Sequence, residues 1–363
     1  MGEISRKLMR TYATSIPSSN FLKLIFSGIQ PTGIPHIGNF LGALTNWASL
    51  QRTANVNDNL LYAIVDLHAL TMPQDPGKLR KNKLDMTIAL LACGIDPARS
   101  IIFEQSKIPA HSECAWILNC ITPVGWLSRM TQWKVKSQQN KNVQSVEDID
   151  SNSGLCLGLF AYPVLQAADI LLYKATHIPI GEDNIQHLEL TRDIAQKINK
   201  LYKKEIFPLP QPILASAKRV MSLRDPSKKM SKSDPSEFSR INLDDTPSEI
   251  ISKIKKATTD PIKGITYDPV GRPAIANLIT IYAAIKVVAI EEIVKEHSNS
   301  NAEQFKEALA QVLIEKLTPV KNEIEKLKID PGYVQQVLKD GNEKASLLAN
   351  KNLDELYKLC GLK

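Results

Sequence analysis

The chain has 363 residues, of which 43% are hydrophobic and 23% charged. It is long enough for two folded domains, and this composition excludes a disordered or collagen-like chain. No uninterrupted apolar run approaches the roughly 20 residues of a membrane-spanning helix, so we expect no membrane partner. The five cysteines, an odd number with no C-x-x-C pair, favour neither a disulfide framework nor a zinc ribbon.

The net charge of +7 is unevenly distributed. Residues 1–235 hold 27 basic and 19 acidic side chains, a difference of +8, whereas residues 236–363 hold 18 and 19, a difference of −1. Part of the excess lies in residues 218–232, where six basic side chains accompany one acidic side chain. Such a run is usually a solvated face. Polyanion binding is the alternative, and it requires a motif.

The first 20 residues, MGEISRKLMRTYATSIPSSN, are basic, rich in Ser and Thr, and lack a long apolar core. This pattern is typical of an organelle transit peptide more than of a secretory signal. A frayed, unprocessed tail is the alternative interpretation.

From residue 21 onward, short apolar runs alternate with amphipathic stretches, which is the rhythm of β-α-β units. It predicts a Rossmann-type α/β domain over residues 21–235, with a parallel sheet flanked by helices. The predicted strands are 22–26, 60–65 and 101–103, and the predicted helices are 40–48, 79–93, 161–173 and 187–202.

Beyond about residue 236 the strand patterns disappear, which predicts an all-helical C-terminal domain over residues 236–363. Pro331–Gly332 and Asp340–Gly341 are expected to break this region between helices. The expected helices are 275–293, 305–327 and 345–359. Inside the first domain, the polar segment 137–153 is predicted to be a mobile insertion.

Residues 27–39, SGIQPTGIPHIGN, form a Gly- and Pro-rich turn between the first strand and a helix. Such a turn can bring backbone N–H groups and a helix N-terminus against a phosphate. Gly38 would allow close approach of a ligand, and His36 and Asn39 could donate hydrogen bonds to phosphate oxygens. Taken alone, the segment could equally be an ordinary turn.

A second motif, KKMSKSD, lies at residues 228–234, at the end of the α/β region. Lys229 and Lys232, separated by Met230 and Ser231, would give a loop two cations able to neutralise charge on a departing pyrophosphate. A solvated connector is the alternative.

The two motifs together resemble those of class I aminoacyl-tRNA synthetases: His36–Ile37–Gly38–Asn39 and Lys229–Met230–Ser231–Lys232–Ser233. The sequence just before and between them resembles tryptophanyl-tRNA synthetases, and the resemblance extends from about residue 24 to the C-terminus. It rests on FSGIQPTG at 26–33, VDLHA at 65–69, YPVLQAADILLY at 162–173 and GED at 181–183.

This resemblance implies an enzyme that activates L-tryptophan with ATP and Mg²⁺, releases pyrophosphate, and transfers tryptophan to tRNA(Trp). The substrate carboxylate would be the nucleophile, so no Ser, Cys or His nucleophile is needed. The resemblance further implies a homodimer, and an anticodon-reading role for residues 236–363. With residues 1–20 as a transit peptide, the expected compartment is the mitochondrial matrix, with the cytoplasm as the alternative.

The resemblance also assigns site residues. Asp169 would accept the indole N–H, with Phe26 and Ile170 among the apolar walls. The expected catalytic residues are Lys229, Lys232, His36 and Asn39. The expected ATP-binding residues are Gln30, Pro31, Thr32, Gly38, Asn39, Gly181, Glu182, Asp183, Val220, Lys229, Met230, Ser231, Lys232 and Ser233. The histidines show no H-E-x-x-H or other metal spacing, so no protein-held metal is expected.

Three residues depart from the family pattern: Trp126, Gln166 and Asn184. Tyrosyl-tRNA synthetase is the nearest rival interpretation, because it shares both nucleotide motifs and needs a carboxylate for its substrate. A small nucleotidyltransferase and a non-catalytic RNA-binding relative are two further interpretations. The helical C-terminal region argues against the nucleotidyltransferase, and Lys229, Lys232 and Asp169 argue against the binding module.

Overall fold

The computed structural model describes residues 21–134, 155–181, 184–214 and 219–363. The predicted transit segment 1–20 and the predicted insertion 137–153 lie outside these ranges.

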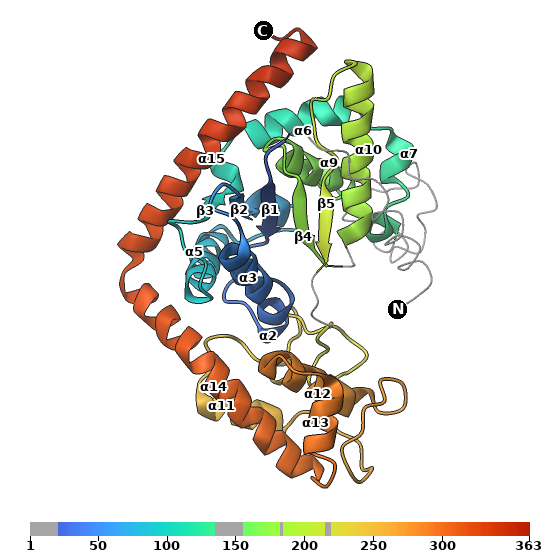
Figure 1. Ribbon diagram of the computed structural model, residues 1–363, viewed down its shortest axis with the longest axis vertical. Helices are drawn as coiled ribbons and strands as arrows, with labels where there is room; N and C mark the ends of the chain where they lie inside the picture. The colour runs from blue at the N-terminus through green and yellow to red at the C-terminus, as the bar shows by residue number, and fades with distance from the viewer. Residues whose placement is uncertain (1–20, 135–154, 182–183, 215–218) are drawn as a thin grey trace.

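The centre of the fold is a parallel five-stranded sheet with the strand order β3-β2-β1-β4-β5 (Figure 1). The predicted strands 60–65 and 101–103 are confirmed within one residue, whereas the first strand begins two residues later than predicted. β4 and β5 were not predicted, because each is only four residues long and contains a proline, which argues against a strand inside a sheet. The strands are β1 (Leu24–Ile29), β2 (Asn59–Ile64), β3 (Ile101–Glu104), β4 (His177–Ile180) and β5 (Gln211–Leu214).

Alternate residues of the central strands face two different hydrophobic clusters, as the period of a strand requires. Ile25 and Tyr62 belong to a cluster that continues into the C-terminal helices, while Phe26 and Leu61 belong to a cluster on the opposite face. The sheet is therefore covered by helices on both faces, which confirms the predicted α/β class. The helices before residue 236 include α2 (Ile37–Asn39), α3 (Thr45–Thr53), α4 (Asp66–Ala69), α5 (Pro76–Ala92), α6 (Ala110–Ile121), α7 (Val124–Leu127), α9 (Leu157–Leu171) and α10 (Ile185–Leu201).

All regular elements longer than three residues after residue 236 are helices, as predicted. The predicted helix 275–293 is interrupted, because Val287 adopts a left-handed conformation (φ 59°) and ends α12. The break at Pro331 is confirmed: the Asp330 carboxylate caps the new helix by accepting from Tyr333 N at 3.0 Å. These helices are α11 (Pro247–Lys255), α12 (Pro273–Lys286), α13 (Ile290–Glu296), α14 (Ala302–Ile329) and α15 (Pro331–Cys360).

The predicted break at Asp340–Gly341 is wrong, since α15 continues through both residues. A Cβ atom on Gly341 would lie 1.7 Å from the carbonyl oxygen of Ile102. Glycine is present here because the helix backbone passes directly over β3, and not because the helix ends.

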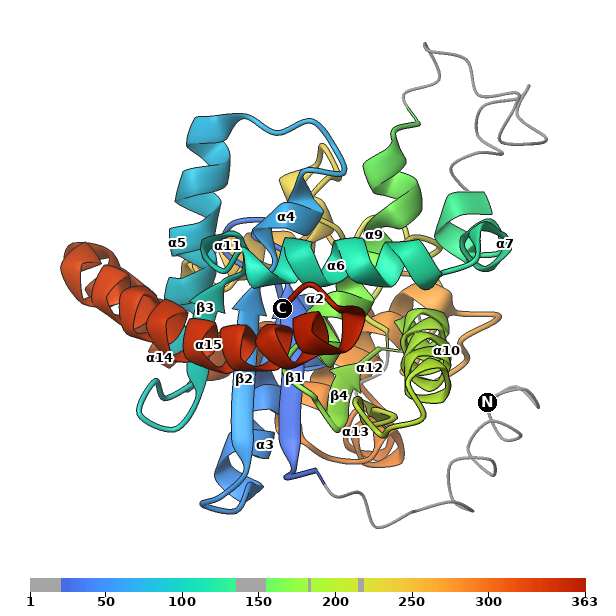
Figure 2. The same ribbon diagram turned by 90° about the horizontal axis from the view of Figure 1, so that it is seen from above.

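Helix α15 returns from the helical region to the sheet. Its later residues, including Ala345 and Leu353, join the hydrophobic cluster that contains Phe26, and Figures 1 and 2 show the helix running past β3 and along α6. Asn342 Oδ1 accepts from Glu104 N at 2.8 Å, which fixes α15 to the end of β3. The functional division of the chain at residue 236 stays a prediction.

In the described part of the chain, no single helix has the length and apolar composition to span a membrane, although α12 and α13, bent by 108° at their junction, meet these criteria as a pair.

Candidate active site

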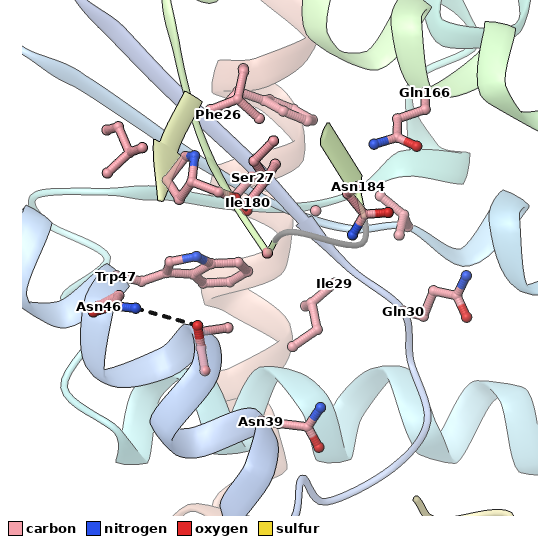
Figure 3. Close-up of a pocket in the computed structure, with 18 of the residues that line it drawn as sticks. Phe26, Ser27, Ile29, Gln30, Asn39, Asn46, Trp47, Gln166, Ile180 and Asn184 are labelled. Carbon is pink, nitrogen blue, oxygen red and sulfur yellow. Dashed lines mark hydrogen bonds between the residues drawn. The ribbon is translucent and has the colours of Figure 1, made fainter. Parts of the chain in front are cut away.

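A cavity of about 670 Å³ opens at the carboxyl end of the sheet, where the reversal of strand order in α/β folds places ligands. Figure 3 shows Phe26, Ser27 and Ile29 from the end of β1, together with Trp47 of α3 and Asn184, around this cavity. The predicted site residues among its lining are Phe26, Gln30, Thr32, Asn39, Asp169, Ile170, Gly181 and Lys229.

The turn after β1 is shaped by residues with special backbone roles. Gly33 has φ +80°, a left-handed conformation that favours glycine. His36 caps α2: its Nδ1 accepts from Gly38 N at 3.0 Å, and its own N–H donates to Asn39 Oδ1 at 3.2 Å. Burial, together with the nearby charges of Lys232 and Arg240, lowers the pKa of His36 to about 4. The ring is therefore neutral at pH 7.

His36 was predicted to donate to phosphate, but it is buried and does not line the cavity. Its described contacts are those of a helix cap that holds the turn in shape. Asn39 and Gln30 do line the cavity, and their amide groups are seen beside it in Figure 3. The turn therefore offers side-chain amides that can donate to phosphate oxygens. The backbone N–H groups of residues 36–39 are already bonded within the protein.

The lysine motif reaches the same site from the other side. Lys229 lines the cavity, and Lys232 Nζ donates to the carbonyl oxygen of Thr32 at 3.0 Å. Burial lowers the pKa of Lys232 to about 8, against the raising influence of Asp244. Lys232 therefore connects the two predicted motifs directly.

The remaining predicted ATP residues differ in exposure. Val220 and Met230 are buried core side chains, so only their backbone atoms could face a ligand. Ser231 and Ser233 are hydrogen bonded to each other through their hydroxyls at 2.8 Å. Pro31 is buried in the turn, Gly38 lies in the first turn of α2, and Glu182 and Asp183 lie outside the described residues.

Asp169 forms the opposite end of the cavity, and the residue is only 1% exposed. Oδ1 accepts from Gln105 Nε2 and His111 Nδ1, both at 2.7 Å, and Oδ2 accepts from His68 Nε2 at 2.8 Å. Burial alone would raise the pKa of Asp169, but the hydrogen bonds from His111 and His68 outweigh it and lower the pKa to about 2. The group is therefore an ionised acceptor at neutral pH.

An aromatic wall supports this end of the cavity. Phe26 stacks on Tyr173 with ring centroids 5.7 Å apart, and the Tyr173 hydroxyl is hydrogen bonded to His111 Nε2 at 2.9 Å. Because an ionised Asp169 can only accept, His111 must carry a proton on Nδ1, so in the neutral ring Nε2 accepts from Tyr173. Tyr173 thereby fixes the orientation of the ring that donates to Asp169.

A second polar group, Tyr162, lies near His68, with ring centroids 6.2 Å apart. The Tyr162 hydroxyl, one of the cavity-lining groups, is hydrogen bonded to Gln132 Oε1 and to His187 Nε2, both at 2.8 Å. Burial lowers the pKa of His187 to about 4, and its Nδ1 has no hydrogen-bond partner among the described residues. Figure 3 shows Gln166, another cavity residue, with its amide directed toward Asn184.

Sequence reasoning identified Asp169 but missed its partners Gln105, His68 and His111. His68 had a detectable signal, because it follows the end of a predicted strand, where parallel sheets gather functional side chains. Gln105 had the same signal after β3. His111 lies inside α6, and nothing in its local pattern indicated that it faces Asp169.

The donor set fits a nucleotide better than a protein-held metal. Within the described ranges, no group of three or more His, Cys, Asp or Glu side chains could hold a metal ion. The turn amides and the two lysines suit a triphosphate, and Mg²⁺ would enter as part of the ATP substrate.

The parallel sheet, the phosphate-type turn after β1 and the lysine motif linked to it are the features of a class I tRNA synthetase. Residues 23–318 match the family described as tRNA synthetases class I (W and Y).

Two relatives and one solved structure narrow the class. The tryptophan–tRNA ligase of Brucella melitensis is 42% identical over 94% of this chain and 99% of its own length. The mitochondrial tryptophan–tRNA ligase of Saccharomyces cerevisiae is 45% identical over 93% of this chain and 90% of its own length. The crystal structure of tryptophanyl-tRNA synthetase from Mycoplasma pneumoniae is similar with a TM-score of 0.82 at 33% identity, covering 94% of this chain and 99% of that one. The chain belongs to the tryptophan–tRNA ligases, which are aminoacyl-tRNA synthetases.

Proposed function

We propose that tryptophan is bound and activated in the cavity at the carboxyl end of the sheet, with Asp169 as the acceptor for the indole N–H. The observation that carries this proposal is the hydrogen bonding of the Asp169 carboxylate. An ionised carboxylate offers about four lone-pair sites, and Gln105, His68 and His111 donate to three of them. One acceptor site is left, and the indole N–H of tryptophan can only donate.

Apolar side chains beside Asp169 support the same assignment. Phe26 and Ile170 are buried and line the cavity, and the stacking of Phe26 on Tyr173 holds the wall rigid. A flat bicyclic ring between such walls loses apolar surface to the protein while its N–H meets the carboxylate. An amino acid without a ring N–H would leave the buried carboxylate without its fourth partner, which is costly.

In the activation step, a carboxylate oxygen of tryptophan attacks the α-phosphorus of ATP. The new O–P bond forms as the bond from the α-phosphorus to the bridging oxygen breaks, and pyrophosphate leaves with that electron pair. The protein supplies position and charge stabilisation. Gln30 and Asn39 contact the nucleotide beside the turn that His36 shapes, while Lys229 and Lys232 stabilise the negative charge that builds on pyrophosphate.

In the transfer step, a hydroxyl of the terminal ribose of tRNA(Trp) attacks the carbonyl carbon of tryptophanyl-adenylate. An ester bond forms as the bond from the carbonyl carbon to the phosphate oxygen breaks; AMP leaves with that electron pair, and the hydroxyl proton is released. The lysines act on pyrophosphate, so they are not required for this second step.

Pyrophosphate exchange with tryptophan, tyrosine and phenylalanine tests the assignment of Asp169. We expect Asp169→Ala to reduce the preference for tryptophan by up to roughly 10⁴-fold while changing the ATP dissociation constant little. The matched control is Asp58→Asn, which alters a buried carboxylate just before β2 that pairs with Lys23 at 2.9 Å. An Asp169→Ala enzyme that still preferred tryptophan would contradict the assignment.

The lysines are tested by the rate of adenylate formation in a single turnover. Lys229→Ala and Lys232→Ala should each lower this rate with a smaller change in ATP affinity, since they act mainly in the transition state. A change confined to the ATP dissociation constant would mean that the lysines bind the ground state.

We extend the proposal to a homodimer, with large apolar side chains as its support. Trp116 of α6 is 71% exposed, and Val124 and Leu157 on neighbouring helices are also exposed. In the dimer, one tRNA would contact both subunits, with its acceptor end at one α/β region and its anticodon at the partner's helical region. The near-neutral charge of residues 236–363 favours stacking and hydrogen bonds over net attraction as the means of anticodon recognition.

Mixed dimers test this arrangement. A subunit with Lys229 and Lys232 replaced by Ala, mixed with a subunit whose helical region is disrupted, retains one intact cross-subunit site. We expect charging above the sum of the separate mutants. The absence of such a gain would contradict the cross-subunit arrangement.

The proposed compartment is the mitochondrial matrix. Its support is the basic, Ser- and Thr-rich composition of residues 1–20, together with similarity to the yeast mitochondrial relative. A fusion of residues 1–25 to a fluorescent reporter should enter mitochondria. A reporter that stays in the cytosol would contradict the proposal.

A further inference from the structure

The lysine motif is the second half of a short antiparallel pairing. Met230 N donates to the carbonyl oxygen of Val220 at 3.1 Å, and Ser222 N donates to the carbonyl oxygen of Lys228 at 2.8 Å. Between these bonds, Met221 lies opposite Lys229. The backbone position of Lys229 is therefore set by residues 220–222.

The outward backbone groups of this pairing are held by one side chain of the helical region. Asn277 Oδ1 accepts from Met221 N at 2.9 Å, and Asn277 Nδ2 donates to the carbonyl oxygen of Met221 at 2.9 Å. Residues 220 and 222 bond to the lysine segment, so the N–H and C=O of Met221 point the other way. The side-chain amide of Asn277 takes the place that a third strand would occupy.

Asn277 is itself held firmly. Its side chain is buried on α12, between fully buried neighbours such as Ala276 and Leu278. Loss of the amide would leave two backbone groups of Met221 without a partner in a site that water reaches poorly, which is unfavourable. The segment would then shift to find new partners.

Residues 220–222 also contact the turn after β1. A Cβ atom built on Gly38 would lie 3.7 Å from Val220 Cβ, so Val220 packs beneath the start of α2. A continuous series of contacts thus runs from α12 through Met221 and Val220 to the lysine motif and to the turn after β1.

We propose that Asn277 is a positioning residue for tryptophan activation, which holds Lys229 at the distance from the turn that stabilisation of the leaving pyrophosphate requires. Asn277 acts through the backbone of Met221 and does not touch the substrates. The inference rests on the proposed role of the lysines.

The test compares Asn277→Ala with the unsubstituted enzyme by three measurements. We expect the single-turnover rate of adenylate formation to fall about 10- to 100-fold, because a misplacement of about 1 Å at a reacting group can cost about 10²-fold. The Michaelis constant for tryptophan should change little. The transfer of tryptophan from preformed adenylate to tRNA should keep its rate, because this step does not use Lys229. Equal losses in both steps would show a general structural defect and overturn the inference.

The matched control is Asn199→Ala. Asn199 holds another loop in the same manner: Oδ1 accepts from Ile206 N at 2.9 Å and Phe207 N at 3.0 Å, and Nδ2 donates to the carbonyl oxygen of Phe207 at 2.8 Å. None of these residues lines the cavity. Asn199→Ala should lower thermal stability while leaving adenylate formation unchanged. An equal loss of activation in both variants would overturn the inference.

A double-mutant cycle separates the inference from the proposed role of the lysines. If Asn277 acts through Lys229, Asn277→Ala should cost little further activation rate in a Lys229→Ala background. An equally large loss of activation rate in that background would overturn the inference. The inference would also be overturned if Lys229→Ala strongly lowered the activation rate while Asn277→Ala left it unchanged. A Lys229→Ala enzyme with full activation would instead contradict the proposed function.

If Asn277→Ala does not fold, Asn277→Asp serves in the same assays. It keeps the volume and the acceptor but loses the donor, and we expect changes in the same direction.

Discussion

Gln105 Nε2 donates to Asp169 Oδ1 at 2.7 Å, while Gln105 Oε1 accepts from the backbone N–H of Leu67 at 3.1 Å. One amide side chain therefore connects the ends of β2 and β3 to α9. Ser106, the next residue, adds a bond from its N–H to the Asp66 carboxylate at 2.9 Å. Lys83 of α5 forms ion pairs with both Asp66 and Glu104. Asp169, the proposed acceptor for the indole, is thus supported by residues of α4, α5 and the turn after β3.

Gln105→Glu is expected to make tryptophan use depend on pH. Two carboxyl groups in contact cannot both ionise easily, so the pKa of the introduced glutamate rises. At low pH the protonated group donates to Asp169 as the amide does. As the pH rises through the raised pKa, both groups become charged, and kcat/KM for tryptophan should fall by about tenfold or more. In the original enzyme this pair contributes no such fall, because Gln105 does not ionise and Asp169, with a pKa of about 2, stays charged.

Gln51→Glu is the control for this substitution. Gln51 also bridges two segments, since Nε2 donates to the carbonyl oxygen of Gly94 and Oε1 accepts from Asp96 N, but it does not line the cavity. Its replacement should leave the pH profile for tryptophan unchanged. A flat profile for Gln105→Glu would contradict the role of Gln105.

A second pH dependence should come from Lys232. Burial lowers its pKa to about 8, so the free enzyme loses this cation as the pH rises above 8. Because kcat/KM reports ionisations of the free enzyme, kcat/KM for ATP should fall above about pH 8 in pyrophosphate exchange. Lys232→Arg should extend the plateau upward, since a guanidinium keeps its proton.

Lys306→Arg is the control for Lys232→Arg. Burial also lowers the pKa of Lys306, which donates to the carbonyl oxygens of Lys255 and Ala257 away from the cavity. Its replacement should not move the alkaline limb. A limb that moves equally in both variants would show a global effect of pH and contradict the assignment to Lys232.

Much of the fold could be predicted because its elements carry local patterns. β2 is a continuous apolar run, and α10 repeats its apolar residues at helical spacing. The features that escaped prediction depend on partners distant in sequence. In the local sequence, Gly341 indicates the end of a helix. In the structure, glycine is needed because any side chain would overlap the carbonyl of Ile102, which lies 239 positions earlier. The prolines in β4 and β5 argue locally against a strand. These segments nevertheless pair with neighbouring strands of the sheet.

The site divides in the same way. The turn at residues 30–39 and the lysine motif are each a continuous stretch of sequence. The residue types and spacing within each stretch indicate its chemistry. The partners of Asp169 come from α4, the turn after β3 and α6, and His111 has no local feature that distinguishes it from a packing histidine. His36 illustrates the converse: its sequence motif is clear, but the motif did not indicate that its Nδ1 accepts from Gly38 N and caps α2.

His187 should make the folded state sensitive to acid. Its pKa is about 4 in the folded protein and about 6.5 when exposed, so the unfolded chain binds more protons between these values. The histidine's contribution to stability is therefore present above about pH 6.5 and is lost as the pH falls toward 4. Between pH 7 and pH 5 the free energy of unfolding should fall by about 2 kcal/mol on account of this residue. In His187→Gln, urea unfolding at the two pH values should show a drop smaller by that amount. An equal drop in both proteins would contradict the prediction.

Gly341→Ala should destabilise the protein by about 3 kcal/mol or more, because the new methyl group would overlap the carbonyl of Ile102. The backbone of α15 fixes the position of the new Cβ atom, and the backbone of β3 fixes the carbonyl, so neither can turn aside as a flexible side chain could. Helix α15 would have to move away from β3, which weakens the bond from Glu104 N to Asn342 Oδ1. Denaturant unfolding measures the loss, and protection of the Glu104 amide from hydrogen exchange reports the displacement.

Gly332→Ala in the same helix provides the matched control. A Cβ atom there would meet only Asp330 Oδ1, at an ordinary contact distance of 3.5 Å, and alanine favours a helix over glycine by about 1 kcal/mol. This variant should be unchanged or slightly more stable. If both substitutions had the same effect, the loss at Gly341 would reflect a change in helix propensity or in the unfolded chain. A large loss at Gly341 alone, accompanied by faster exchange at Glu104, would follow from the close passage of α15 over β3.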